Sequence, residues 1–192
     1  MYAWSVFKTV YAISYTGDAD ITTQPISQSQ FEGFDVTFNC SATASPTLTF
    51  IWKKDSTNIA SDNRHYVTSN NQSSTLVITG LDASDAGNYS CVANDNGTIS
   101  PSNDAILTVK SNPSILTHPI SQYVFENTNA TLSCKATGNP VPSLSWKKEE
   151  TNVTSSDRLI IQTTNGQSSL TIIKFNKTID EGNYKCVAKS RR

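Results

Sequence analysis

The stretch Asp85-Ala-Gly-Asn-Tyr-Ser-Cys91 decides the fold of this chain, because it returns 95 residues later as Asp180-Glu-Gly-Asn-Tyr-Lys-Cys186. The octapeptide Ile21-Thr-Thr-Gln-Pro-Ile-Ser-Gln28 likewise returns as Ile115-Leu-Thr-His-Pro-Ile-Ser-Gln122, at an offset of 94 residues. A repeat of this length is too long for a solenoid of short units. The sequence therefore predicts two tandem copies of one domain.

The four cysteines of the chain fall two in each copy, at Cys40 and Cys91 and at Cys134 and Cys186. Four cysteines allow three connectivities, and the repeat favours pairing inside each copy, Cys40 with Cys91 and Cys134 with Cys186. In the chain-entropy model, closing a loop of ~50 residues contributes about 4 kcal/mol. Reduced cysteines are the alternative, whereas a zinc site is disfavoured because no C-x₂-C spacing occurs.

Apolar and polar residues alternate in both copies, as in Val36–Ser41 and Leu48–Lys53 of the first and Leu170–Ile172 of the second. A period of two, with Gly, Asn, Asp and Pro between the runs, is typical of antiparallel sheets that bury one face. We expect no helix longer than a turn, and hence an all-β fold.

The composition of the 192 residues excludes several classes of protein. The net charge is −1, with 36% hydrophobic and 16% charged residues, which suits small β domains with polar surfaces. No basic excess is available to neutralise phosphates, so we expect no nucleic-acid binding. No run of 18 apolar residues occurs that could span a bilayer.

The cysteines and aromatic residues of each copy resemble the immunoglobulin superfamily. Cysteine is followed twelve positions later by tryptophan, and tyrosine stands two positions before the second cysteine. The resemblance is to tandem I-set domains of cell-adhesion molecules and receptor ectodomains, including those of receptor tyrosine kinases. It implies two tandem immunoglobulin-like β-sandwiches, in which tryptophan packs on the inter-sheet disulfide and tyrosine forms a corner. The core residues so implied are Trp52, Tyr89, Trp146 and Tyr184, and the implied structural ion pairs are Arg64–Asp85 and Arg158–Asp180.

The predicted domains are 19–110 and 114–192, joined by a linker at 111–113 and preceded by an extension at 1–18. The first ends in a final (G) strand over Ile106–Val109, whereas the second reaches only six residues past Cys186. We therefore expect the second sandwich to lack its own G strand and to leave an open sheet edge.

Residues 1–17 belong to neither copy and allow three interpretations. A signal peptide is one, although Lys8 interrupts the apolar stretch and no basic segment precedes it. An extension without a structural role is the second. The third is a strand over Val6–Ile13 that completes the second domain of another copy or adds to a sheet edge, because that stretch has high β propensity.

Glycosylation sequons indicate the compartment. Seven occur, of which the first, Asn39, is the least favourable acceptor; the six candidates are Asn71, Asn88, Asn96, Asn129, Asn152 and Asn176. Together with two disulfides they predict a secreted or cell-surface protein. A cytosolic, muscle-type immunoglobulin domain is the competing interpretation.

The inventory for catalysis is poor. His65 and His118 are the only histidines, and no nucleophile elbow, phosphate loop or zinc-ligand spacing occurs. We expect no enzyme, no catalytic or metal site, and no cofactor.

Binding is the expected role, and the sheet of strands C, F and G is the expected contact surface of the first domain. Its candidate residues are Ile51, Lys53 and Val92, and a glycan on Asn88 would block the same face. We expect a homophilic adhesion module with a protein partner, either the same or a related immunoglobulin-like ectodomain, through a weak homodimer. Membrane tethering is expected only through parts outside these residues. The alternative is the ligand-binding ectodomain of a receptor tyrosine kinase-like or immune-type receptor, with a basic strip formed by Lys147, Lys148 and Lys185 that binds an acidic partner.

Overall fold

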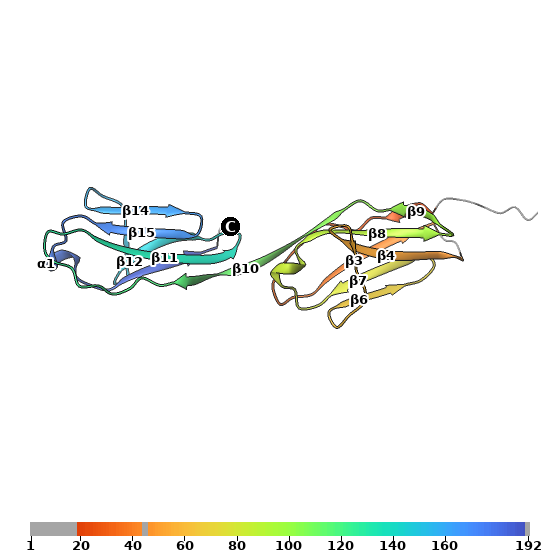
Figure 1. The fold of residues 1–192 in the computed structure, drawn as a ribbon, viewed down its shortest axis with the longest axis horizontal. Helices are drawn as coiled ribbons and strands as arrows, with labels where there is room; N and C mark the ends of the chain where they lie inside the picture. Colours follow the sequence, from red (N-terminus) through yellow and green to blue (C-terminus); the bar gives the residue numbers. More distant parts are fainter. Residues whose placement is uncertain (1–18, 44–45, 191–192) are drawn as a thin grey trace, which may run out of the picture. The chain divides into compact units, whose positions relative to one another are not determined.

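The structure is a computed structural model that describes residues 19–43 and 46–190. These residues form two β-sandwich domains (Figure 1). The helical segments among them are single turns, the 3₁₀ turn η1 (Ala83–Asp85) and the helix α1 (Lys177–Asp180). The prediction of an all-β fold is therefore confirmed, and the described residues contain no helix longer than a single turn.

The first domain contains two sheets. One has the strand order β1-β3-β7-β6, and the other has the order β10-β8-β4-β5, with β2 paired to β10 and β9 paired to β8. The strands of the first sheet are β1 (Ile21–Thr23), β3 (Val36–Ala42), β7 (Ser73–Ile78) and β6 (His65–Ser69). Those of the second are β2 (Gln28–Phe31), β10 (Ala105–Thr117), β8 (Gly87–Asp95), β4 (Leu48–Lys54), β5 (Thr57–Asn58) and β9 (Thr98–Pro101).

The second domain repeats this plan with fewer strands. The later part of β10 pairs with β11, which continues to β15 and β14, while the opposite sheet has the order β13-β12-β16. The strands are β11 (Ala130–Asn139), β15 (Gln167–Ile172), β14 (Leu159–Thr164), β13 (Thr151–Val153), β12 (Ser143–Lys148) and β16 (Tyr184–Lys189). Among the described residues no strand lies on the outer edge of β16.

The cores follow the alternation that the sequence shows. Along β3, Val36, Phe38 and Cys40 are buried, and the residues between them are exposed or half-buried. The ring of Phe38 stacks on that of Tyr89 with centroids 4.9 Å apart. Alternate side chains of a strand point to opposite faces, so each sheet contributes one apolar face to the core.

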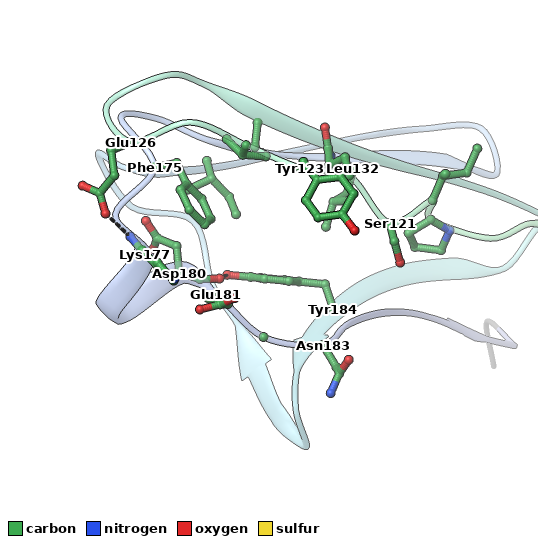
Figure 2. Close-up of a pocket in the computed structure, with 17 residues that line it drawn as sticks. Ser121, Tyr123, Glu126, Leu132, Phe175, Lys177, Asp180, Glu181, Asn183 and Tyr184 are labelled. Carbon is green, nitrogen blue, oxygen red and sulfur yellow. Dashed lines mark hydrogen bonds between the residues drawn. The ribbon is translucent and has the colours of Figure 1, made fainter.

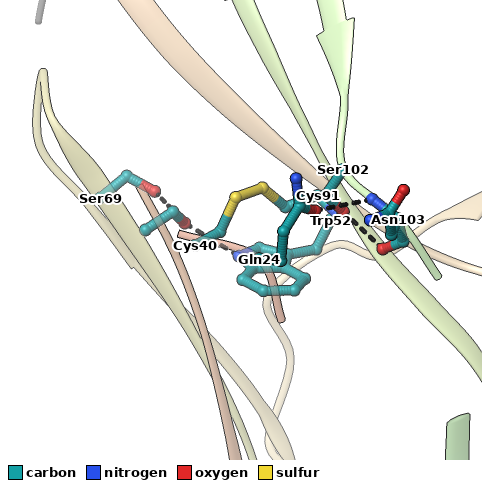
Figure 3. Close-up of a disulfide and its surroundings, with 8 residues drawn as sticks. Gln24, Cys40, Trp52, Ser69, Cys91, Ser102 and Asn103 are labelled. Atoms are coloured by element: carbon teal, nitrogen blue, oxygen red, sulfur yellow. Dashed lines mark hydrogen bonds between the residues drawn. A yellow bond between two sulfur atoms is a disulfide. The ribbon is translucent and has the colours of Figure 1, made fainter. Parts of the chain in front are cut away.

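Each core is centred on a disulfide and a tryptophan. Cys40 is bonded to Cys91 in the first domain and Cys134 to Cys186 in the second, so pairing inside each copy is confirmed. Trp52 lies beside the first disulfide, and its indole N–H donates to Ser74 Oγ at 2.9 Å (Figure 3).

Residues 111–113, expected to be a linker, lie inside β10. Pro113 has no N–H to donate, and the β10–β11 register shifts between Ser111 and Ser114, on either side of the proline. The shift in the β10–β11 register therefore allows Pro113 to lie within β10.

Candidate functional site

The outer face of the β4-β8-β9 sheet in the first domain carries a row of apolar side chains. Ile51 lies opposite Val92, which in turn lies opposite Pro101. Residues directly opposite in antiparallel strands project to the same side of the sheet. Ile51 is 39% exposed. It therefore stands on a solvent-facing surface, as the sequence predicted.

Ile99 belongs to the same face and was missed in the sequence. It lies opposite Asn94, which lies opposite Thr49, two residues from Ile51. Ile99 is 63% exposed, more than Ile51. Its position depends on β9, a short strand after the turn at Gly97 that no alternation in the sequence reveals.

The other two predicted contact residues are less accessible than expected. Val92 is only 7% exposed, because β8 is an interior strand flanked by β4 and β9. Val92 can thus offer little area to a partner, and the prediction of an exposed Val92 needs this correction. Lys53 is half-buried. We define the outer patch as Thr49, Ile51, Lys53, Ile99 and Pro101.

Asn88 stands on the same strand as Val92, four residues away, which corresponds to about 13 Å along a strand. Its side chain is exposed, and its backbone N–H donates to Asp55 Oδ1 at 2.9 Å. That bond is the main cause that lowers the pKa of Asp55, with a further hydrogen bond from Lys54. The first turn after β4 is thereby tied to β8, close to a predicted glycan acceptor.

The corresponding face of the second domain is polar. Ser145 and Lys147 on β12 lie opposite Val187 and Lys185 on β16. Lys147 Nζ lies 3.2 Å from Glu150 Oε2. This face therefore offers no counterpart of the apolar row around Ile51.

The predicted basic strip is not continuous. Lys148 donates from Nζ to the carbonyl oxygen of Ile179 and lies over the ring of Tyr184 at 5.8 Å. Adjacent residues of β12 project to opposite faces, so Lys148 points away from Lys147 and Lys185. Two lysines remain on one face, one of them paired with a carboxylate.

The two histidines occupy separate, structural positions. His65 begins β6, and its Nδ1 lies 3.0 Å from Asp62 Oδ2. Backbone N–H groups of Arg64 and His65, together with the His65 ring, lower the pKa of Asp62 to about 2. His118 is exposed and follows β10.

Of the two ion pairs implied by the resemblance, the structure shows the one in the second domain. Arg158 Nη2 donates to Asp180 Oδ2 at 2.5 Å, and the backbone N–H of Asn176 donates to the same oxygen at 2.7 Å. In the first domain Asp85 is buried and accepts from the backbone N–H of Asp82 at 2.8 Å. The pairing of Arg64 with Asp85 stays a prediction.

The tyrosine of the second domain has the geometry of a corner. Tyr184 donates its hydroxyl to the carbonyl oxygen of Asp180 at 2.8 Å. Burial, followed by the nearby charge of Asp180, raises the pKa of Tyr184. Tyr184 is nevertheless only half-buried, whereas Tyr89 of the first domain is completely buried.

The six candidate glycan acceptors are all exposed, as is Asn39. Asn39 accepts a hydrogen bond from the Thr75 hydroxyl at 3.0 Å, and Asn176 caps α1 by accepting from the backbone N–H of Thr178 at 3.0 Å. Which of them carries a glycan stays a prediction. The three interpretations of residues 1–17 concern residues outside the described ranges.

A groove of about 510 Å³ opens in the second domain between residues 119–126 and the start of β16 (Figure 2). Ser121 and Tyr123 stand on one side of it and Tyr184 on the other, with Leu132 also in its lining. We call it the edge groove. No pattern in the sequence predicts a cavity at this position.

Both domains thus place a tryptophan and a disulfide between two sheets, with a tyrosine two residues before the second cysteine. The family model described as immunoglobulin domain matches residues 20–95 and 112–190. The chain belongs to the immunoglobulin domain family.

Relatives in this family include the netrin receptor DCC of Rattus norvegicus, 34% identical over 160 residues, which are 83% of this chain and 10% of the receptor. Neural cell adhesion molecule 1 of Gallus gallus is 32% identical over 168 residues, 81% of this chain and 15% of that protein. This chain thus spans only about a tenth to a seventh of the length of these two relatives.

Among solved structures, a complex titled Dpr11 IG1 bound to DIP-gamma IG+IG2 superposes with a TM-score of 0.72 at 22% identity, covering 91% of this chain and 92% of that one. This likeness supports the tandem immunoglobulin fold. No helix in the described part of the chain is long and apolar enough to cross a membrane.

Proposed function

We propose that this protein is an extracellular, non-catalytic recognition module that mediates homophilic adhesion through the outer patch of its first domain. The observation that carries the proposal is the pair of exposed isoleucines, Ile51 and Ile99, on the outer face of β4, β8 and β9. Exposed apolar side chains that gather on one sheet face provide area for a partner protein. Relatives named as an adhesion molecule and as a receptor support a role at the cell surface.

A patch of this size suits a weak contact. Small interfaces between single domains give affinities of roughly micromolar or weaker, and many copies on apposed surfaces raise the avidity. The predicted partner is therefore a second copy or a related immunoglobulin-like ectodomain, and a low affinity is compatible with adhesion.

Sedimentation equilibrium of the whole chain over a hundredfold range of concentration tests the proposal. We expect reversible dimers, and we expect Ile51→Asp or Ile99→Asp to weaken dimerisation at least tenfold, because each buries a charge in the contact. Ser145→Asp is the matched control, since Ser145 is the second-domain counterpart of Ile51 by the repeat of 94 residues. It should leave dimerisation unchanged.

Three results would contradict homophilic adhesion through this patch. They are a monomer at every concentration, dimers that both isoleucine variants retain, and dimers that are lost only when residues 1–17 are deleted. A monomer would favour the alternative, a ligand-binding receptor ectodomain. Enzymatic glycan removal is a further arm, because an occupied Asn88 would cover the patch.

A further inference from the structure

Strand β14 of the second domain lies at the margin of its sheet, where another chain can add a strand. It is the first strand in the order β14-β15-β11-β10, and no strand of the described residues pairs with its outer edge (Figure 1). Its sequence, Leu-Ile-Ile-Gln-Thr-Thr, is rich in β-branched residues and contains neither a charge nor a proline. An edge strand of this kind is a template for pairing with a copy of itself unless something covers it.

Two serines that precede β14 cover the first half of this edge. The N–H of Leu159 donates to Ser156 Oγ at 3.1 Å, and the N–H of Ile161 donates to Ser155 Oγ at 3.3 Å. The carbonyl oxygen of Leu159 accepts from the N–H of Ser156 at 2.8 Å. In an antiparallel edge strand, the backbone groups of every second residue point away from the sheet. The three bonds therefore occupy outward-pointing groups that an added strand would need.

The first domain has the same arrangement on its own edge strand, β6, which ends the order β1-β3-β7-β6. The N–H of His65 donates to Asp62 Oδ1 at 2.7 Å, and the N–H of Val67 donates to Ser61 Oγ at 3.1 Å. The carbonyl oxygen of His65 accepts from the N–H of Asp62 at 2.9 Å. All four residues stand 94 positions before their counterparts in the second domain. The three bonds are therefore kept although aspartate replaces serine at one position.

One of the bonds in each domain extends beyond the local turn. The turn that leads into β14 is closed by Ser156 and Leu159, three residues apart. Ser155 lies six residues from Ile161, and its hydroxyl takes no part in closing that turn. It accepts instead from the next outward N–H along the edge. The segment before β14 thus runs beside the strand and takes the place of a neighbouring strand.

We propose that Ser155 and Ser156 guard the edge of β14 against pairing with β14 of a second copy. Two identical strands pair antiparallel about a two-fold axis, which would join the sheets of two copies into one. The guard prevents this and leaves contact between copies to the faces of the sheets. The proposal does not depend on the outer patch, since β14 belongs to the other domain.

Sedimentation equilibrium of the whole chain over a hundredfold range of concentration tests the guard. The parent chain carries Ile51→Asp, so that contact through the outer patch does not contribute. Adding Ser155→Ala together with Ser156→Ala should cause association at concentrations at least tenfold below those of the parent, because the outward N–H groups lose their partners. Thr154→Ala is the matched control, since Thr154 is an exposed neighbour in the same segment and makes none of these bonds. It should leave the parent unchanged.

Hydrogen exchange locates the contact. In the monomeric double variant the amide of Ile161 should exchange faster than in the parent, and on association the amides of Ile161 and Thr163 should become protected. If the double variant does not fold, Ser155→Ala alone, which keeps the turn at Ser156, takes its place with the same expectations.

A peptide of residues 158–165 provides a second test, because it carries the sequence of β14. It should bind the double variant and dissolve the assembly, whereas a peptide with the same residues in scrambled order should not, and neither should bind the parent. Two results would overturn the proposal. One is a double variant that associates no more than Thr154→Ala does, and the other is association that leaves the amides of β14 unprotected.

Discussion

At the residue scale, the tryptophan of each core depends on one serine. Trp146 donates its indole N–H to Ser168 Oγ at 2.9 Å, and Ser168, which is 4% exposed, also shares a hydrogen bond with Thr163 at 2.8 Å. Ser74 has the same two bonds, with Trp52 at 2.9 Å and Ser69 at 2.7 Å. The serine is thus a repeated part of the core.

Ser168→Ala should lower the free energy of unfolding of the second domain by about 1–3 kcal/mol, because it leaves a buried N–H without an acceptor. Urea denaturation of the whole chain, with the two domains resolved, measures the change. Ser169→Ala is the control, since Ser169 is its neighbour on β15 and points to the opposite face. An equal loss in both variants would show that the indole bond contributes nothing.

The repeat made the cysteines, tryptophans and tyrosines of the core predictable from sequence. The two serines also belong to the repeat, because Ser74 and Ser168 are related by the same offset of 94 residues. Serine is too common in the chain, however, for its recurrence to indicate a role in the core. Ile99 was not predictable in the same way. Its exposure depends on a four-residue strand at a sheet margin, and the pairing of that strand is a tertiary property.

At the scale of elements, the turn between β14 and β15 is constrained at both of its residues. It consists of Asn165 and Gly166, with φ values of 42° and 79°. Positive φ at both residues is the requirement of a type I′ turn, which Asn-Gly satisfies. The carbonyl oxygen of Gly166 accepts from the N–H of Ala136 at 2.7 Å, so the turn is also fixed to β11.

Gly166→Ala should destabilise its domain by more than the ~1–2 kcal/mol that a left-handed conformation costs an alanine. A Cβ there would lie 2.8 Å from the carbonyl oxygen of Ala136, and backbone cannot move aside as a flexible side chain can. Gly33→Ala is the matched control, because Gly33 has a φ of +83° and nothing within 4 Å of its Cβ position. Thermal unfolding of the two variants compares them, and an equal cost would mean that the contact with Ala136 relaxes freely.

The strands themselves were predictable, because their alternation is local, but their ends and continuity were not. Pro113 in Lys110-Ser-Asn-Pro113 predicted a linker, and the structure makes these residues part of β10. The sequence could not show the pairing with strand β11. The register of that pairing shifts beside Pro113, so the ladder needs no N–H from the proline. The edge groove could not be predicted either, since it depends on side chains from two stretches far apart in sequence, 119–132 and 172–184.

At the scale of the whole molecule, the two domains share a fold but differ in how completely their cores are covered. β10 covers the first core with Ala105, Leu107 and Val109, all at most 3% exposed. Burying one valine or leucine side chain contributes about 1.5–3 kcal/mol. Among residues 114–190 no strand makes the equivalent contribution, and Tyr184 and Ala188 remain half-buried.

In the chain without residues 1–17, we therefore expect two unfolding transitions, with the second domain melting first and the amides of β16 exchanging before those of β8. Hydrogen exchange followed along a temperature series assigns each transition to its domain. Leu107→Ala should lower the temperature of the upper transition only, since deleting a buried leucine side chain costs about 2–5 kcal/mol. The difference between the two transition temperatures should therefore become smaller or change sign. A single transition with equal protection of β8 and β16 would show instead that the cover of Leu107 and Val109 adds little to the stability of the first domain, and that a disulfide and a tryptophan core suffice in both.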